Sequence, residues 1–446
     1  MSTQTPPTSA SAQCGKLLRA GMVGMGMIFD ETYRPVFESL HRGGLCERSI
    51  GGICGVELAA VATRTGNRAE AYRESARDRI GPFVSFHGPN AIEQMLLAEK
   101  SDARSDDGGS LDFACVATPD DRHFAAARAI LAAGKHLLVE KPSVLSLAEL
   151  DELVRLARQN GVLAKVVYHK LLDPDHKRMR TLVADGELQH VNHGYCSLLE
   201  PKAIGKGQFV EWIWGRNPGT YVAVHYIKLI DFTFGGHLRS VACTGQRGII
   251  GPTDGPTWDS TQLRLVYEYA DGREAAFDIH TSWVTPDNFP GHVEQEVQFR
   301  FDNGVWTAHG RRRGVECTIE GRTPQPRKIT PNHHYNAEVL EPWGERAARG
   351  YGLEAIERFV REVARVEFGG PQTERPGRLE AARSLDYNDL SADRQVVAAV
   401  QAMEAILARR AAGLPDAVVY VNHPAGGLAL FSPGRSEPDL LYAGPV

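Results

Sequence analysis

The first residues with recognisable chemistry are glycines that follow a short apolar run. The run 17–24 has the composition of a strand and leads directly into the segment 24–29, GMGMIF. A strand, a G-x-G turn and a helix place backbone N–H groups and the helix dipole where they can hold a pyrophosphate. The residues that we expect to bind a dinucleotide here are Gly24, Gly26, Met27 and Ile28. Phe29 stands where the full fingerprint has its third glycine, so a tight turn without a ligand is the alternative.

The end of the next expected strand, 56–64, bears on which dinucleotide is bound. It ends in Thr63, Arg64 and Thr65, without the carboxylate that binds the ribose hydroxyl of NAD. An arginine at this place can pair with the 2′-phosphate of NADP, which makes Arg64 a candidate for cofactor binding. An exposed arginine that only ends a strand is the alternative, and the expected cofactor is NAD or NADP.

Further motifs follow in a fixed order. They are VATPDDRH (116–123), KHLLVEKP (135–142) and GTYVAVHYIKLIDFTFG (219–235). Together with GMVGMG (21–26), this combination resembles the Gfo/Idh/MocA oxidoreductases, the family of glucose-fructose oxidoreductase and inositol dehydrogenase. The resemblance covers about residues 17–410, and it depends on several motifs that agree in order.

The resemblance implies roles for residues in each motif. It places Lys141 beside the nicotinamide ring and the substrate hydroxyl, and His225 matches the histidine of the family. Tyr221 stands where an Asp is usual and Lys228 where a later Asp is common, so the chain departs from the inositol dehydrogenase pattern. The remaining residues that it places at the cofactor are Thr118, Pro119, His123 and Glu140.

These residue types suit the oxidation of an alcohol. A neutral imidazole, with an ordinary pKa near 6.5, can take the hydroxyl proton while hydride leaves carbon, which is the role expected of His225. Lys141 can stabilise the negative charge that develops on the oxygen. Tyr221, four residues before His225 on one helix face, can orient it or join the proton relay but supplies no negative charge. For His225, the alternative is a hydrogen-bonded histidine of the core.

Candidate substrate contacts lie outside these motifs. Lys170 follows a strand at a place where relatives have a basic or polar contact, and Trp212, Trp214, Arg216 and Asn217 precede the His225 helix. Aromatic rings and fixed polar groups together suit a sugar. Core packing or an oligomer interface is the alternative for the tryptophans. His280, Trp283 and the segment 331–336 are weaker candidates, and His333-His334 lack a third ligand, so no metal site is expected.

The elements that must position these residues follow from hydrophobic periodicity. Short apolar runs alternate with amphipathic stretches such as 120–135 and 146–161 as far as about residue 170, which predicts a parallel sheet covered by helices. Beyond about residue 190, hairpin signals at Asp271-Gly272 and Asn303-Gly304 predict an antiparallel sheet. Helical periodicity returns at 352–368 and 391–413.

The expected fold class is therefore α/β. It comprises a disordered tail (1–16), an N-terminal Rossmann dinucleotide-binding domain (17–168) and a C-terminal α/β domain with a large, mostly antiparallel open sheet (169–446). The segments 41–55 and 98–110 are rich in glycine, serine and charge, and we interpret them as irregular surface insertions.

Composition limits the class of partner. Fifty basic and 55 acidic residues give a net charge of −5, which argues against a nucleic-acid or membrane-coating protein. No apolar run has the length of a membrane span or a signal peptide, so we expect a cytoplasmic protein. Seven scattered cysteines, with no C-x-x-C, predict reduced and mostly buried thiols.

The expected function is NAD(P)-dependent oxidation of a ring hydroxyl of a sugar, glycoside or cyclitol. The resemblance also implies a homo-oligomer, a dimer or tetramer. Two other classes stay open: an NAD-dependent glycosidase that oxidises its sugar transiently, eliminates the leaving group and returns the hydride, and a non-catalytic dinucleotide-binding regulator.

Overall fold

The chain forms two compact units in the computed structural model. The structure describes residues 15–76, 78–101, 110–208, 212–287, 293–310, 317–319, 327–329, 332, 334–424 and 426–446. The first unit comprises Met1–Ser143, Glu149–His169 and Tyr335–Ala392, and the second Val144–Ala148, Lys170–His334 and Asp393–Val446.

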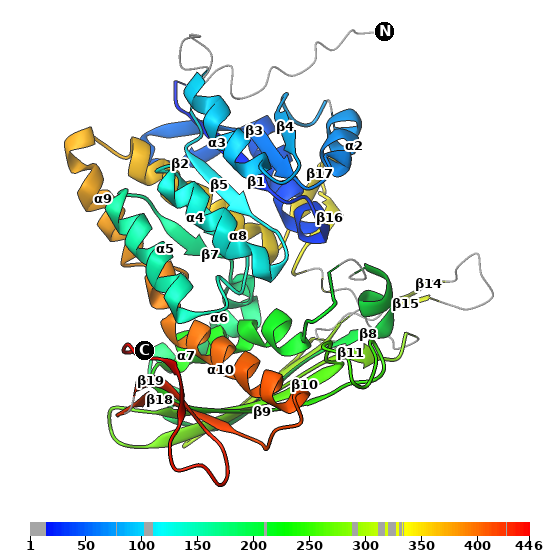
Figure 1. Cartoon of the computed structure of the whole chain (residues 1–446). Coiled ribbons are helices and arrows are strands. Elements are labelled where there is room, and N and C mark those ends of the chain that lie inside the picture. The colour runs from blue at the N-terminus through cyan, green and yellow to red at the C-terminus, as the bar shows by residue number, and fades with distance from the viewer. Residues whose placement is uncertain are drawn as a thin grey trace. The chain divides into compact units, whose positions relative to one another are not determined.

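The first unit is built on a seven-stranded sheet in the order β2-β3-β1-β5-β6-β7, with β4 paired to β3 (Figure 1). The pairs among β1, β3, β4, β5, β6 and β7 are parallel, and β2 is antiparallel to β3. The strands are β1 (Leu17–Val23), β2 (Leu45–Glu47), β3 (Gly52–Thr63), β4 (Val84–His87), β5 (Phe113–Val116), β6 (His136–Val139) and β7 (Ala164–Val166). β5, β6 and β7 are buried along their whole length, as parallel strands covered on both faces are, and apart from His136 in β6 and Lys165 in β7 their residues are apolar.

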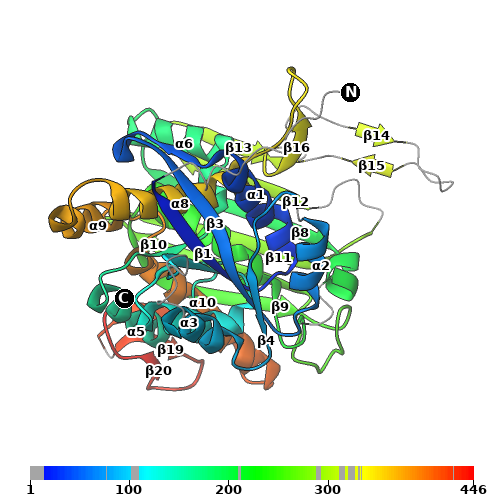
Figure 2. The same cartoon turned by 90° about the horizontal axis from the view of Figure 1, so that it is seen from above.

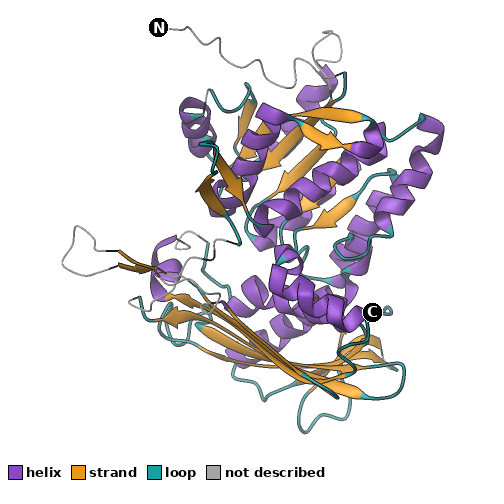
Figure 3. Ribbon diagram, turned by 180° about the vertical axis from the view of Figure 1, so that it is seen from behind, coloured by secondary structure: helices purple, strands orange, loops and turns teal. Residues whose placement is uncertain are grey.

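Helices cover this sheet on both faces (Figure 3). α5 shows why they pack: Leu147, Leu150, Leu153 and Ala157 recur at helical spacing and are all buried. The α-helices of the unit are α1 (Arg34–Gly43), α2 (Asn67–Ser75), α3 (Ala91–Ser101), α4 (His123–Ala132), α5 (Leu147–Gln159), α8 (Tyr351–Phe368) and α9 (Arg375–Arg383). A separate hairpin, β16 (Ala337–Leu340) with β17 (Arg346–Arg349), precedes α8.

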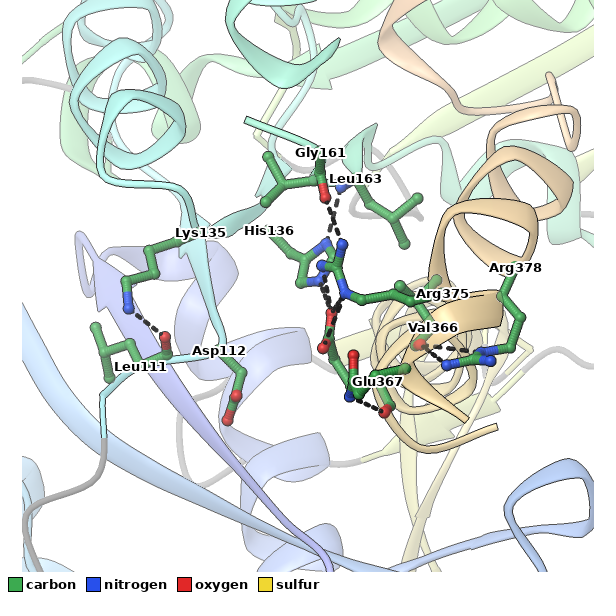
Figure 4. Close-up of polar contacts among 12 residues, drawn as sticks. Leu111, Asp112, Lys135, His136, Gly161, Leu163, Val366, Glu367, Arg375 and Arg378 are labelled. Atoms are coloured by element: carbon green, nitrogen blue, oxygen red, sulfur yellow. Dashed lines mark hydrogen bonds and ion pairs between the residues drawn. The ribbon is translucent and has the colours of Figure 1, made fainter. Parts of the chain in front are cut away.

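A partly buried polar network fastens the end of α8 to the sheet (Figure 4). His136 at the start of β6 accepts a hydrogen bond from the Leu163 N–H at Nδ1 (2.8 Å), and its Nε2 lies 2.8 Å from Glu367. The backbone donor leaves Nε2 as the protonated nitrogen of a neutral ring, and burial lowers the pKa of His136. Arg375 donates to both oxygens of Glu367 and to the Gly161 carbonyl. Phe359 of α8 completes the contact by packing edge-on against Phe113.

The second unit contains a nine-stranded sheet in the order β13-β12-β8-β11-β10-β9-β18-β19-β20. Its pairs are antiparallel except for the parallel pair of β8 and β11. The strands are β8 (Val191–Pro201), β9 (His237–Gln246), β10 (Ser260–Glu268), β11 (Glu274–Thr285), β12 (Glu294–Phe301), β13 (Val305–His309), β18 (Val418–His423), β19 (Gly426–Phe431) and β20 (Asp439–Tyr442). A further hairpin, β14 (Cys317–Ile319) with β15 (Arg327–Ile329), belongs to the same unit.

Helices lie on one face of the large sheet, as the labels in Figure 1 show. They are α6 (Pro174–Ala184), α7 (Val224–Phe234) and α10 (Arg394–Ala411). Alternating residues of β10 and β11, among them Leu263, Leu265 and Ile279, are fully buried, so the period-two pattern sets which face is covered. Phe234 of α7 packs on Phe277, which fixes the end of that helix to the sheet.

Most of the expected elements are confirmed, including both hairpins, with Gly272 at φ +80° in the first turn. The interpretation of 41–55 as irregular was wrong. The segment contains β2 and a 3-10 turn (Arg48–Ile50), and Glu47 is held by Arg361 and Arg365 of α8. Most of the second expected insertion, residues 102–109, lies outside the described residues. The division into units also differs from a single boundary near 168, because residues 335–392 return to the first sheet.

Candidate active site

The glycine turn follows β1, and its two glycines differ in what surrounds them. Gly24 has φ +89°, and a Cβ there would lie 2.3 Å from the Ala117 carbonyl oxygen, so the fold itself requires glycine. A Cβ at Gly26 would meet no atom within 4 Å. Neither backbone conformation nor packing explains Gly26, whereas close approach of a pyrophosphate does, so the turn fits a dinucleotide.

The helix after the turn begins as a π-helical turn over Phe29–Tyr33, termed η2, and continues as α1. Met27 and Ile28 lie between Gly26 and this turn, where N–H groups can face an anion. The Phe29 ring is buried and packs edge-on against Tyr72 of α2 at 5.3 Å. The departure from a third glycine is thus explained by packing between η2 and α2.

Two arginines lie after β3. Arg64 is exposed just after the strand, and the Thr63 hydroxyl accepts a hydrogen bond from Gly66 N–H in the turn to α2. Arg68, in the first turn of α2, donates to the Met25 carbonyl at 3.2 Å, and its side chain is 67% exposed. Arg68 was not among the predicted cofactor residues, although a second arginine four residues after Arg64 was a usable signal. Arg68 also lies 3.9 Å from Asp30 of η2, so it links α2 to the glycine turn and to the helix that follows it.

Thr118 and Pro119 follow β5, and His123 begins α4. The Thr118 Oγ1 is buried and has no hydrogen-bond partner among the described residues. Buried polar atoms usually have such a partner, so this hydroxyl is a candidate to bind a ligand. His123 is buried, with its Nδ1 2.7 Å from the Pro142 carbonyl and its Nε2 2.8 Å from the Thr118 carbonyl. Burial lowers the pKa of His123. Its contacts tie the loop after β5 to the loop after β6, which is a positioning role; a direct cofactor contact stays a prediction.

Glu140 and Lys141 follow β6, and the Lys141–Pro142 peptide is cis. Glu140 is buried and accepts a hydrogen bond from the Tyr33 hydroxyl at 2.9 Å. Burial raises the pKa of Glu140 to about 7, although Lys141 and the Tyr33 hydrogen bond act in the opposite direction. Because β1, β5 and β6 are parallel neighbours, their three loops meet at one edge of the sheet.

In the second unit, the predicted helix around His225 begins differently from expectation. Residues Gly219–Ala223 form a π-helical turn, termed η7, and His225 lies in the first turn of α7. Tyr221 is therefore in the π-helical turn rather than on a continuous α-helix with His225. His225 is 5% exposed, whereas Tyr221 is half-buried. The next residue, Tyr226, donates to the Ser197 carbonyl of β8 at 3.0 Å and so fixes the start of α7 on the sheet.

Tyr221 forms an aromatic cluster with Trp212 and Trp283, which were predicted only as separate candidates. Its ring centre lies 5.1 Å from that of Trp212 and 6.2 Å from that of Trp283 on β11. The indole N–H of Trp283 donates to Glu200 of β8 at 2.8 Å, and both side chains are buried. Glu200, which the sequence gave no signal for, thus places a carboxylate beside this cluster.

The other expected substrate contacts are in different surroundings. Asn217 is buried and works as a cap, because its Oδ1 accepts from Thr220 N–H at 2.7 Å and its Nδ2 donates to Glu404 at 2.8 Å. Lys170 is buried and donates to Gln295 on β12. Trp214 is 66% exposed. A substrate contact for each stays a prediction, and the Asn217 contacts are those of a structural residue.

The weaker candidates contact aromatic neighbours or lie outside the described residues. His280 packs edge-on against Tyr195 on the neighbouring strand. His333 lies outside the described residues, whereas the Tyr335 ring contacts the rings of His169 and Tyr351 at tilted angles in the first unit. No group of three or more potential ligands in the described part of the chain could hold a metal ion. Within the same residues, no helix combines the length and hydropathy needed to cross a bilayer.

Comparison with known proteins agrees with this geometry. Residues 18–168 match a family model described as "Oxidoreductase family, NAD-binding Rossmann fold". The glycine turn and this match define a nicotinamide-dinucleotide-binding oxidoreductase. A D-xylose dehydrogenase of Paenarthrobacter nicotinovorans is 42% identical over 279 residues, which cover 58% of this chain and 68% of the relative. The chain belongs to the Gfo/Idh/MocA family of oxidoreductases.

Other relatives are more distant. Trans-1,2-dihydrobenzene-1,2-diol dehydrogenase of Oryctolagus cuniculus is 26% identical over 64% of this chain and 88% of its own. The matches cover only 23% to 51% of the length of four further curated relatives. Among solved structures, an inositol dehydrogenase homologue of Azotobacter vinelandii, solved with NADH and myo-inositol, has a similar fold. Its sequence is 18% identical, the TM-score is 0.62, and the match covers 91% of this chain and 98% of that one.

Proposed function

We propose that the protein is an NAD(P)-dependent dehydrogenase that acts on a ring hydroxyl of a sugar, glycoside or cyclitol. The observation that carries the proposal is the convergence of Gly26, Thr118 and Lys141 after β1, β5 and β6 at one edge of the first sheet. An open Cβ position, a buried hydroxyl without a partner and a lysine are the groups that a dinucleotide and a reacting alcohol need there.

Each catalytic residue has a separate task in this proposal. The nicotinamide ring, when bound, accepts or returns the hydride. His225 takes the hydroxyl proton as a general base, and Lys141 stabilises the negative charge that develops on the reacting oxygen. Tyr221 orients His225 or relays the proton, and its ring packs against those of Trp212 and Trp283.

The charges near the turn favour NADP over NAD. The described residues at the end of β3 include no carboxylate for a ribose 2′-hydroxyl, and Arg64 and Arg68 offer two guanidinium groups instead. A guanidinium pairs well with a phosphate. We therefore include a preference for NADPH in the proposal.

The aromatic cluster supports a carbohydrate or cyclitol as substrate. Rings such as those of Trp212 and Tyr221 stack on the C–H faces of a sugar, and Lys170 can contact a hydroxyl. Two similar proteins are consistent with such a substrate. One relative is a D-xylose dehydrogenase, and one solved structure of the same fold contains myo-inositol.

The first test is mass spectrometry of the native protein for bound dinucleotide. The protein is then incubated with a panel of sugars, glycosides and cyclitols, while reduced nicotinamide and released aglycone are both recorded. Net cofactor reduction with an intact substrate supports the proposal. Aglycone release without net cofactor change would replace it by a redox-cycling glycosidase, and dinucleotide binding without any turnover by a non-catalytic protein.

The catalytic assignment is tested by Lys141→Ala and His225→Ala. Each variant should lose turnover by at least about 100-fold, the range for a positioned acid–base group, while binding of reduced cofactor persists. The exposed residues Lys177 and His193 give matched controls, as Lys177→Ala and His193→Ala should turn over like wild type. Wild-type rates in either catalytic variant contradict the assignment.

A further inference from the structure

A buried pair joins the dinucleotide turn to the loop of the proposed catalytic lysine. Tyr33 ends η2, the turn of helix that follows the glycines, and Glu140 precedes Lys141. The Tyr33 hydroxyl donates to Glu140 Oε1 at 2.9 Å, across 107 residues of sequence. Tyr33 is fully buried and Glu140 is 5% exposed. The buried Tyr33 hydroxyl thus has Glu140 as its acceptor, and Glu140 also accepts a hydrogen bond from the Lys141 backbone N–H.

The charged and titratable groups around this pair are few. Glu140 faces Lys141, Tyr33 and Cys115, and Tyr33 also faces Tyr335. Burial raises the pKa of Tyr33 well above its ordinary value, and the neighbouring Glu140 raises it further, so Tyr33 stays a neutral donor. Burial raises the pKa of Cys115 too, so the thiol stays protonated. Lys141 is the cation that favours an ionised Glu140.

We propose that Tyr33 is a positioning residue for Lys141: its hydroxyl holds the Glu140 carboxylate in the place and charge state that Lys141 requires. The idea rests on the proposed function of Lys141. The ionised carboxylate stabilises the lysine ammonium, which then donates to the substrate oxygen. Because η2 follows the glycine turn, this hydrogen bond connects the proposed dinucleotide turn to the residue that precedes Lys141.

The sign of the effect follows from the chemistry of the pair. The Tyr33 hydroxyl stabilises the ionised form of Glu140 and so lowers its pKa, which burial has raised to about 7. Without this donor, the Glu140 pKa rises, by about one unit for one hydrogen bond to a charged group. With a pKa near 8 instead of 7, the ionised fraction at pH 7 falls about five-fold, and at pH 9 the two proteins are nearly equal.

The experiment compares wild type with Tyr33→Phe, which keeps the ring and removes only the hydroxyl. The acid limb of the kcat profile should move up by about one pH unit, with kcat about five-fold lower at pH 7 and the KM for dinucleotide within two-fold. Tyr72→Phe is the matched control, because this buried hydroxyl bonds Glu38 at 3.3 Å, away from Lys141, and its profile should not move. An unshifted profile in Tyr33→Phe overturns the proposal.

A second readout needs no substrate. The carboxyl stretch of Glu140 is followed by infrared difference spectroscopy against pH, with the band assigned by its loss in Glu140→Gln. A higher titration midpoint in Tyr33→Phe supports the proposal, and an unchanged midpoint overturns it. If wild type turns over nothing in the panel, the proposed function fails, whereas this measurement still decides whether Tyr33 controls Glu140.

Discussion

Replacement of Gly26 by alanine separates the fold of the glycine turn from its use. Gly26 does not have a positive φ, and an added Cβ meets no atom within 4 Å. Folding should therefore tolerate the change, and the smaller entropy of the unfolded chain should stabilise the protein by up to about 1 kcal/mol. The new methyl group instead occupies the space in which we expect the pyrophosphate.

The expected effect on binding is large. Loss of one backbone hydrogen bond to a charged phosphate is worth about 1.5–3 kcal/mol, which is about a 10- to 150-fold rise in Kd. The measurement is titration of reduced dinucleotide by calorimetry or fluorescence, together with thermal unfolding of the unliganded protein. Gly26→Ala should show weak binding with an unchanged or higher Tm.

Gly24→Ala is the contrasting variant. Its φ of +89° costs alanine about 1–2 kcal/mol, and the 2.3 Å approach to the Ala117 oxygen adds about 1–3 kcal/mol of overpacking. This variant should therefore lose about 2–5 kcal/mol of unfolding free energy. If Gly26→Ala binds dinucleotide as tightly as wild type, the turn does not hold the pyrophosphate, and the reasoning is refuted.

Two other predictions concern charge. Burial raises the pKa of Glu367, but hydrogen bonds from its partners outweigh burial and lower this pKa to about 2. Glu367→Gln should therefore lose about 1–2 kcal/mol of unfolding free energy above pH 4.5, after allowance for partial exposure. This loss should vanish as the pH falls towards 2, where the carboxylate becomes protonated in the folded protein as well. Denaturant unfolding at pH 7 and pH 3 checks this, and an equal loss at both pH values contradicts it. Arg64→Ala and Arg68→Ala should each weaken NADPH about 10-fold and NADH little, with the exposed Arg73→Ala as control. An equal loss of affinity for NADPH and NADH in these variants would exclude a site for the 2′-phosphate.

Local patterns were enough to predict much of the fold. The runs that became β1, β5 and β6 are mostly apolar because both faces of the strands are covered, and Asp271-Gly272 marked its hairpin. Period-two and helical patterns reflect burial of one residue relative to its neighbours in sequence, so they can be read without knowledge of distant contacts.

The rest depends on contacts that a local pattern does not contain. The Tyr33–Glu140 pair joins residues 107 positions apart, and the Trp283–Glu200 pair joins two strands that are not consecutive. The π-helical start of the His225 helix was missed because hydrophobic periodicity over five residues does not distinguish it from an α-helix. Asn217 has the residue type of a sugar contact and of a helix cap, and only the structure shows that it caps.

The return of residues 335–392 to the first sheet has a consequence for synthesis on the ribosome. α8 supplies Phe359, which packs on Phe113, and Glu367, which binds His136 of β6. The sheet is complete in sequence by Val166, yet it lacks this cover until the whole segment 170–334 has been translated. The nascent first unit therefore exposes apolar surface throughout that interval, and its folding is coupled to contacts of long sequence separation. A chaperone that binds exposed apolar segments could therefore bind this chain after Val166 has been translated and before the segment 335–392 has packed on the sheet.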